Sequence, residues 1–328
     1  MEIAAFCRQS RVVVVAGKGG VGKSTVVAAL GRMAADAGLS VLIVELEGRP
    51  GIGEAFGGSE ALGYDESDLY RAGGGAAGGG AVVRARRITP DDALLEYLAD
   101  HGLRRVSKRL VSSGVLDIVA TAIPGIRDVL VLGKVKRLEQ DQVADLVVLD
   151  APATGHAVTF LTSARGLLGV ARGGPVRTQA TEVAALLADP ARCQVILVTL
   201  PEEMPVSETI EAAYLVEDRA GVRLGPVVVN GLTALTPGLG VPAAEAARAA
   251  GVHVDPAELH ALEAARLFRL RRAELQAEQV DRLARELPLP QLRLPALLSG
   301  SVGPAELAVL ADALAAEVDA LAPELAST

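Results

Sequence analysis

Cysteine and aromatic residues are scarce in this chain of 328 residues. It holds two cysteines, no tryptophan and 2% aromatic residues, although half of its residues are hydrophobic. Cys7 and Cys193 form no Cys-x-x-Cys pair, which excludes a four-cysteine zinc or iron–sulfur site within one chain, though not a site shared by two subunits. An apolar content made mainly of Ala, Val and Leu favours helices layered on a parallel sheet over an all-β sandwich.

Long apolar runs are also missing. The first run, Val12–Ala16, is too short for a signal peptide and leads directly into glycines. No stretch reaches the roughly 18 apolar residues that a membrane-spanning helix needs. We therefore expect a soluble cytoplasmic protein without direct membrane insertion.

Basic residues are fewer than acidic residues in this chain. The chain has 32 Lys and Arg against 40 Asp and Glu, for a net charge of −8. Binding to a phosphate backbone requires clustered Lys and Arg, so we do not expect nucleic acid as a partner. The candidate basic stripe is Arg266–Arg272, "RLFRLRR", which we interpret as the solvated face of a helix.

Short apolar runs alternate with segments of helical spacing along the chain. The runs are nearly continuous, as expected for parallel strands that are covered on both faces. The predicted strands are Val12–Ala16, Val41–Glu45, Leu146–Asp150, Val195–Thr199 and Val227–Asn230, and the predicted helices include Val26–Ala37 and Ser207–Glu217. This alternation predicts an α/β fold with a mainly parallel, helix-covered sheet.

Three segments depart from this alternation. Tyr70–Gly80 contains "AGGGAAGGG" and is predicted to be a flexible loop. Residues 88–140 are predicted to form a helical insertion, whose first helix is capped by Thr89. Residues 242–328 are predicted to be a helical C-terminal region with one final strand near "LPLPQLRLPALLSG". We expect the 328 residues to form a single domain.

The segment Gly17–Ser24 matches G-x-x-x-x-G-K-[ST], the phosphate-binding loop, and stands between a predicted strand and a predicted helix. Its glycines let backbone N–H groups turn toward phosphate oxygens, and the following helix adds its positive end. Lys23 should reach the β- and γ-phosphates, and the Ser24 hydroxyl should bind Mg²⁺. The predicted nucleotide-binding residues of this loop are Gly17, Lys18, Gly19, Gly20, Val21, Gly22, Lys23, Ser24 and Thr25.

Lysine is used sparingly, since the chain has five lysines against 27 arginines, yet two of them, Lys18 and Lys23, lie in this loop. The ordinary phosphate-binding loop explains only Lys23. Asp150 ends an apolar strand and is the predicted second magnesium ligand, with a helix N-cap as the alternative role. No [NT]KxD motif that would read guanine is present, so we predict ATP with Mg²⁺ as the bound nucleotide.

The stretch "KGGVGKST", Lys18–Thr25, resembles the deviant Walker A motif K-G-G-x-G-K-[ST] of the ATPase class that contains ParA, MinD, the nitrogenase iron protein and ArsA. Three further stretches are similar to motifs of the ArsA and tail-anchored-protein-targeting ATPases. They are "DAPATGH" from Asp150 to His156, "VTLPEEMPVSET" from Val198 to Thr209, and "VVVNGL" around Asn230. The resemblance covers about residues 12 to 232, with a looser match near Pro295.

The resemblance implies a P-loop NTPase that binds ATP at a dimer interface. In this class the extra lysine crosses the interface to the partner subunit's nucleotide, and Lys18 occupies that position. The resemblance also implies that Asn230 reads adenine and that Glu202 and Pro295 contact the nucleotide. The match is closer to a single-unit bacterial branch that is often encoded as paired paralogues, which implies a homodimer or a heterodimer with a paralogue.

The chain departs from the family at several positions. Glu47 stands where family members carry the aspartate that orients the attacking water, and its extra methylene displaces the carboxylate, so hydrolysis could be slow. The alternative is that Glu45 and Glu47 are solvated acids at the end of a strand. The metal-binding cysteines of the arsenite pump are absent, and three methionines do not provide the adaptable groove of a tail-anchor binder.

The sequence therefore predicts an ATPase with Lys18, Lys23 and Glu47 as catalytic residues. It would use ATP binding and hydrolysis as a conformational switch for a client protein that the sequence does not identify. A metalloid (arsenite) efflux subunit is an alternative, but it would require clustered thiolates. A MinD- or ParA-like positioning ATPase is another, but the amphipathic C-terminal segment 304–325 is acidic and is interpreted as a packing helix.

Overall fold

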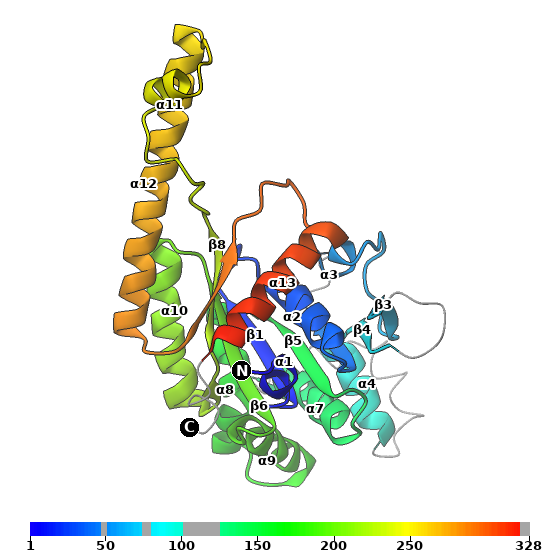
Figure 1. The fold of residues 1–328 in the computed structure, drawn as a ribbon. Coiled ribbons are helices and arrows are strands. Elements are labelled where there is room, and N and C mark those ends of the chain that lie inside the picture. Colours follow the sequence, from blue (N-terminus) through cyan, green and yellow to red (C-terminus); the bar gives the residue numbers. More distant parts are fainter. Residues whose placement is uncertain (47–50, 74–79, 101–124, 322–328) are drawn as a thin grey trace.

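The computed structural model describes residues 1–46, 51–73, 80–100 and 125–321. One sheet runs through these residues, with the strands in the spatial order β3-β4-β2-β5-β1-β6-β8-β9 and the short β7 beside β6 (Figure 1). β3 is antiparallel to β4, and the other pairings are parallel. The strands are β1 (Val12–Gly17), β2 (Val41–Glu45), β3 (Ser67–Arg71), β4 (Val82–Arg87), β5 (Leu146–Ala153), β6 (Cys193–Thr199), β7 (Arg223–Leu224), β8 (Val227–Leu232) and β9 (Gln291–Pro295).

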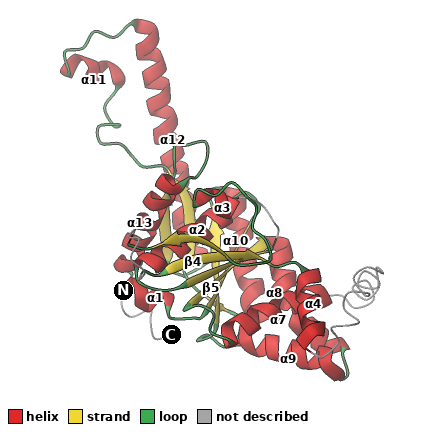
Figure 2. Cartoon of the chain, turned by 90° about the vertical axis from the view of Figure 1, so that its right-hand side faces the viewer, coloured by secondary structure: helices red, strands yellow, loops and turns green. Residues whose placement is uncertain are grey.

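Helices cover both faces of this sheet (Figures 1 and 2). Most of them connect parallel strands, as the βαβ pattern requires. A short π-helical turn, Val216–Ala220, directly continues one of them. The α-helices are α1 (Ile3–Cys7), α2 (Lys23–Asp36), α3 (Gly51–Ala55), α4 (Pro90–Asp100), α7 (Ile126–Gln140), α8 (Thr154–Val170), α9 (Gly174–Ala188), α10 (Glu203–Leu215), α11 (Ala243–Ala249), α12 (Pro256–Glu286) and α13 (Pro304–Ala320).

The hydrophobic core has two parts, one on each face of the sheet. Alternate residues of β1 divide between them: Val12 and Val14 pack with α7, α8 and α9, whereas Val13 and Val15 pack with α2 and α13. The strands of the centre are buried on both sides, which accounts for their continuous apolar runs. The predicted P-loop NTPase α/β fold with a mainly parallel, helix-covered sheet is confirmed.

The five predicted strands all exist, and four of them are longer than predicted. β2 has the predicted bounds, while β5 continues beyond the predicted end at Asp150 to Ala153, and α8 begins directly at Thr154. The N-cap prediction at Thr89 is confirmed, because its Oγ1 accepts a hydrogen bond from the backbone N of Asp92 at 3.2 Å.

Two neighbouring strands at one end of the sheet, the edge strand β3 and the adjacent β4, escaped the sequence analysis. β3 and β4 flank the predicted glycine-rich loop, so Tyr70 and Arg71 belong to a strand, while residues 74–79 lie outside the described part. β4 was missed because its sequence, VVRARR, is rich in arginine. Arg84 lies 2.5 Å from Glu66, and Arg86 stacks over the ring of Tyr64, which compensates these charges.

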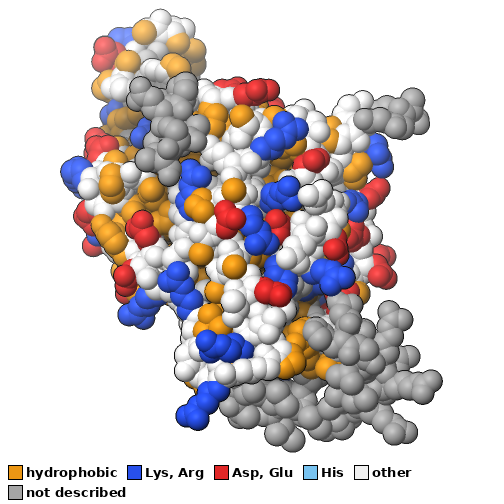
Figure 3. Space-filling view, turned by 90° about the horizontal axis from the view of Figure 1, so that it is seen from below, with side chains coloured by type: hydrophobic (Ala, Val, Ile, Leu, Met, Phe, Trp, Pro, Cys, Tyr) orange, Lys and Arg blue, Asp and Glu red, His pale blue; other side chains and the backbone are white. Residues whose placement is uncertain are grey.

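The C-terminal region was predicted to be helical with one strand, and its described residues contain α11, α12, β9 and α13. α13 packs against α2, as expected for a packing helix. α12 holds the basic stripe Arg266–Arg272 on its outer part, where Arg271 and Arg272 are exposed as predicted, whereas Arg266 and Arg269 are half-buried. On the lower face, basic and acidic side chains are interspersed (Figure 3).

Candidate functional site

The phosphate loop lies at the carboxyl end of β1, at the middle of the sheet, and leads directly into α2. Gly17 is required there, because a Cβ at this position would lie 2.3 Å from the carbonyl oxygen of Val198 in the neighbouring β6. Gly20 and Gly22 both have φ of +88°, a left-handed conformation that glycine adopts without strain. The backbone therefore makes the turn that exposes N–H groups at the start of a helix.

The two lysines of the loop have different partners. Lys23 Nζ donates to the carbonyl oxygen of Lys18 at 3.2 Å and so lies against the loop itself. Lys18 Nζ instead donates to Oε1 of Glu208 on α10 at 2.5 Å. Both members of this ion pair are about one-third exposed, at 34% and 35%. The lysine that the ordinary loop does not need is thus held away from the loop by an acid of its own chain.

The two predicted magnesium ligands lie together. Ser24 Oγ, in the first turn of α2, donates to Oδ2 of Asp150 on β5 at 2.6 Å. Asp150 is 9% exposed. A hydroxyl and a carboxylate are hard oxygen donors, the kind that Mg²⁺ prefers, so the side chains present fit this ion. When bound, it would neutralise charge on the β- and γ-phosphates.

Glu45 is a second acid at this edge of the sheet, and its burial was not predicted from the sequence. Glu45 ends β2 in register with Asp150 of β5 and is 3% exposed. The alternative that Glu45 is a solvated acid at a strand end is therefore wrong. Two buried carboxylates thus lie on adjacent strand ends beside the phosphate loop. The pattern "VLIVE", a charged residue that ends an apolar strand, was the available signal.

Asn230 contacts the loop. Its Nδ2, at the carboxyl end of β8, donates to the carbonyl oxygen of Val21 at 2.9 Å. A Cβ on Gly22 would lie 2.4 Å from the same nitrogen, so the glycine makes room for the amide. In this state Asn230 holds the loop, and its predicted contact with adenine stays a prediction.

The remaining predicted residues have varied surroundings. Thr25 is half-buried in the first turn of α2, and Glu202 is exposed immediately before α10. Pro295 ends β9 in register with Leu232 of β8, so it lies at the same edge of the sheet as the loop. Glu47, the predicted water-orienting residue, lies outside the described residues. Its role therefore also stays a prediction.

The two cysteines lie on opposite sides of the sheet. Cys7 packs in the core part that contains α2, and Cys193 in the part that contains α7 to α9. Both are buried, and burial raises the pKa of each thiol to about 12. Within one chain they cannot converge on a soft metal ion. The described residues also contain no group of three or more His, Cys, Asp or Glu side chains with metal-binding geometry.

Two other lysines line a cavity of about 570 Å³ between α4, α7 and α9. Lys134 forms an ion pair with Glu96, and Lys136 forms one with Glu182. These pairs join α7 to α4 and to α9 respectively, so the lysines have a structural explanation in helix packing. None of the helices in the part of the chain covered by the structure is long and apolar enough to span a membrane.

Comparison with known proteins identifies related families. Residues 12–52 match the family described as CobQ/CobB/MinD/ParA nucleotide binding domain, and residues 92–168 match the one described as Anion-transporting ATPase. The first match covers the phosphate loop. The second ends in α8, which begins just beyond Asp150.

The chain is also similar to three curated ATPases. It is 39% identical to ATPase BagA of Mycobacterium tuberculosis over 229 residues, which cover 67% of this chain and 64% of BagA. It is 27% identical over 224 residues to the arsenical pump-driving ATPase of Escherichia coli, covering 67% of this chain and 34% of that protein. It is 28% identical over 153 residues to ATPase get3 of Schizosaccharomyces japonicus, covering 45% and 42%.

The matched part of this chain thus spans less than two thirds of BagA and about a third of the arsenical pump-driving ATPase. The family models, these relatives and the phosphate loop on a parallel sheet agree with one another. The chain belongs to the ArsA-like ATPase family.

Proposed function

We propose that this protein is an ATPase that binds Mg²⁺ and ATP at its phosphate loop and works as a dimer whose two subunits face each other across their nucleotides. ATP binding and hydrolysis would switch the dimer between two arrangements that a client or partner protein recognises. The dimer is a homodimer or a heterodimer with a paralogue. As an ATP-dependent switch, the protein would work in the cytoplasm.

The single observation that carries magnesium-dependent nucleotide binding is the hydrogen bond from Ser24 to Asp150. It brings a hydroxyl and a carboxylate together beside a loop whose backbone is shaped for phosphates. Lys23 would reach the β- and γ-phosphates from the same loop. These groups would position the nucleotide and balance its charge, which is the main catalytic need in phosphoryl transfer.

The partner of Lys18 supports a role across the dimer interface. Because Glu208 holds its ammonium, Lys18 is directed toward α10. Release from Glu208 would allow this long side chain to extend to the phosphates of a facing subunit. There it would stabilise the negative charge that develops during hydrolysis. Glu47 is proposed to orient the attacking water, with slow hydrolysis expected from its longer side chain.

A complementation experiment tests the shared site. One chain carries Lys18→Ala, and the other carries Asp150→Asn. Each variant alone should hydrolyse ATP poorly. Mixed dimers should recover activity, because the Asp150→Asn subunit supplies an intact lysine to the intact magnesium site of the Lys18→Ala subunit.

One outcome of the complementation experiment would contradict the shared site. If Lys18 acts on the nucleotide of its own subunit, neither chain of the mixed dimer has a complete site. Activity would then stay at the level of the separate variants at every mixing ratio. Unmodified chain diluted with an inactive Lys23→Ala chain provides the reference for subunit exchange.

A further inference from the structure

A helical arm, residues 234–275, projects beyond the edge of the sheet at which the phosphate loop lies (Figures 1 and 2). α12 has 31 residues and is about 46 Å long at 1.5 Å per residue. The six-residue β8 rises only about 20 Å. The buried residues of α12 are Gln276, Val280 and Leu283, so the helix stands clear of the sheet from Pro256 to Leu275.

The arm exposes many large apolar side chains. Phe268 is the most exposed of them, at 66%, although Phe6 and Phe160 of this aromatic-poor chain are buried. An exposed apolar surface of this kind is typical of an interaction site. The exposed large apolar residues of the arm are Leu235, Val241, Val252, Leu262, Leu267, Phe268 and Leu275.

Polar contacts help to hold the arm together. The carboxylate of Glu263 on α12 accepts a hydrogen bond from the backbone N of Ala243 at 2.8 Å and pairs with Arg266 at 2.6 Å. Arg266 also donates to the carbonyl oxygen of Leu239 at 3.1 Å. These contacts connect α12 to the start of α11 and to the chain before it, while the large apolar residues named above stay exposed.

The base of the arm is anchored next to the phosphate loop. Gln276 is 4% exposed, and its side-chain amide forms two hydrogen bonds with the backbone at the carboxyl end of β8. Its Nε2 donates to the carbonyl oxygen of Gly231 at 3.2 Å, and its Oε1 accepts from the backbone N of Thr233 at 2.9 Å. Asn230, which holds the loop, directly precedes this anchor. The arm is thus set in a defined position relative to the nucleotide site.

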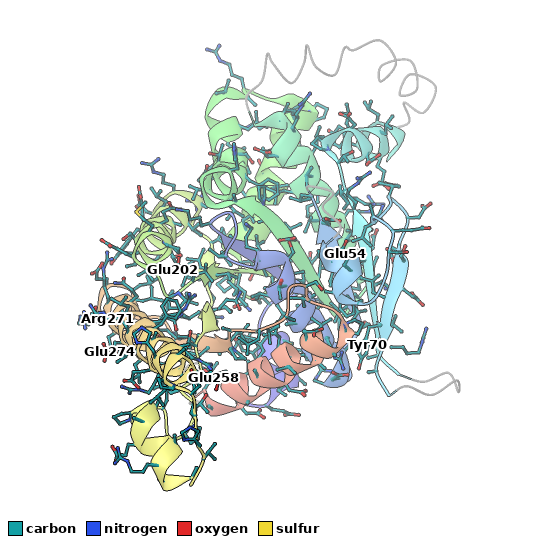
Figure 4. The ribbon with its side chains drawn as sticks, turned by 90° about the horizontal axis from the view of Figure 1, so that it is seen from above. Glu54, Tyr70, Glu202, Glu258, Arg271 and Glu274 are labelled. Atoms are coloured by element: carbon teal, nitrogen blue, oxygen red, sulfur yellow. The ribbon has the colours of Figure 1, made fainter. Side chains whose placement is uncertain are left out.

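The nucleotide edge of the body has a complementary surface. Met204, at the start of α10, is 61% exposed, and Leu298, after β9, is 94% exposed. Glu54 and Glu203 are exposed at this edge as well. Figure 4 looks down on the edge and shows Glu54 across the face from the arm, where Arg271 and Glu274 project from α12.

Two surfaces of one chain are both apolar and differ in local charge. The outer part of α12 carries Arg269, Arg271 and Arg272 beside Leu267 and Phe268, with Arg271 paired to Glu274 at 3.3 Å, whereas the edge combines acids with exposed apolar residues. Surfaces that match within one sequence can pair twice in a two-fold dimer, because each copy offers both of them.

We propose that the arm packs on the nucleotide edge of a second copy of this chain. This rests on the proposed function, since facing nucleotide edges place each projecting arm alongside the other subunit. Leu267 and Phe268 then cover apolar residues at the edge of that copy, while the arginines lie near its acids. The arm adds contact area outside the nucleotides and makes dimer formation sensitive to salt.

The first test compares the double variant Leu267→Ser/Phe268→Ser with the control Val170→Ser. Val170 is 76% exposed on α8. Dimer dissociation constants are measured by sedimentation equilibrium with Mg²⁺ and ATP, and ATP affinity by equilibrium dialysis. At protein concentrations too low for dimers, the arm variant should bind ATP as tightly as the unmodified chain, yet at higher concentration it should dimerise at least tenfold more weakly. The control should match the unmodified chain in both measurements.

A second test exchanges charges between the arm and the edge, and it identifies the surface on which the arm packs. Arg269→Glu/Arg272→Glu reverses the sign of two charges on the arm, and Glu54→Arg/Glu203→Arg reverses the sign of two charges on the edge. Each variant alone should dimerise weakly, because its arm and edge then repel each other. An equimolar mixture should dimerise tightly, since both pairings become opposite in charge.

The outcomes separate the two proposals. If the unmodified chain dimerises with ATP and the arm variants dimerise equally well, the arm inference is overturned while the shared nucleotide site stands. If the charge-reversed variants dimerise weakly but their mixture is no tighter, the arm does not contact the edge of a second copy. If the unmodified chain binds ATP and stays monomeric, the homodimer is excluded, and with it the packing of the arm on a second copy.

Discussion

Lys18 Nζ lies 2.5 Å from Oε1 of Glu208 in the same chain. Each of the two side chains is about one-third exposed, so water screens their attraction. An exposed ion pair contributes about 0.2–1 kcal/mol. Glu208 therefore restrains Lys18 weakly, and the phosphates of a nucleotide, with more than one negative charge, can compete for it.

Replacing Glu208 should release the lysine. Glu208→Gln keeps the shape and removes the negative charge, and we expect it to strengthen ATP-dependent dimerisation by up to about fivefold. Glu211→Gln, one turn further along α10, is the matched control and should change nothing. A weaker dimer in Glu208→Gln would show that the acid supports the assembled state.

Asp150→Asn should weaken ATP binding chiefly when magnesium is present. The substitution removes one carboxylate charge beside Ser24, and we expect at least a tenfold rise in the dissociation constant with Mg²⁺. In EDTA the two proteins should bind ATP with similar affinity. Asp141→Asn is the control, because Asp141 forms an exposed ion pair with Arg137. An equal loss with and without magnesium would contradict the role in metal binding.

Gly22 and Gly19 should differ as sites for alanine. Gly22 has φ of +88°, and an added Cβ would lie 2.4 Å from Asn230 Nδ2, whereas a Cβ on Gly19 meets nothing within 4 Å. Gly22→Ala should lower the free energy of unfolding of the nucleotide-free chain by about 1–3 kcal/mol. Gly19→Ala should change it by less than about 0.5 kcal/mol. Urea unfolding measures both, and equal effects would refute the assigned geometry.

Acid should loosen the arm through Glu263. Its pairing with Arg266 lowers the pKa of the carboxyl from 4.5 to about 2. The stabilising contribution is therefore present above pH 4.5 and is lost as the pH falls from 4.5 to 2. Hydrogen exchange at the Ala243 amide, its backbone partner, should accelerate over this range relative to the intrinsic rate. Glu263→Gln should remove that pH dependence, and an unchanged profile would count against the pair.

The two thiols should be unreactive in the folded protein. With the pKa of each raised to about 12 by burial, roughly one thiol in 10⁴ is ionised at pH 8. Ellman's reagent should modify neither in native buffer and both in urea. Fast modification of Cys7 or Cys193 in the native protein would contradict their buried positions.

The sequence predicted the elements that follow a local rule. The phosphate loop, the strands around it and the cap at Thr89 depend on glycine spacing, apolar runs and short-range hydrogen bonds. Ser24 and Asp150 were also predicted to share one site, because both adjoin the carboxyl ends of parallel strands.

Other features depend on partners that lie far away in the sequence. β4 is a strand despite its arginines because Glu66 and Tyr64 compensate them. Lys18 and Glu208 meet across 190 positions. The sequence did not reveal that Asn230 also donates to a carbonyl group of the loop, a contact across 209 positions. The projection of α12 depends on how much of the helix the sheet can cover, which its sequence does not reveal.

The specific ATPase activity of the pure chain, measured with Mg²⁺ over a wide range of protein concentration, tests the central claim most directly. If two subunits share their nucleotides, activity per subunit should rise with concentration as dimers form, and Lys18→Ala should abolish the rise. Activity that stays constant from the monomeric to the dimeric range would contradict the shared site.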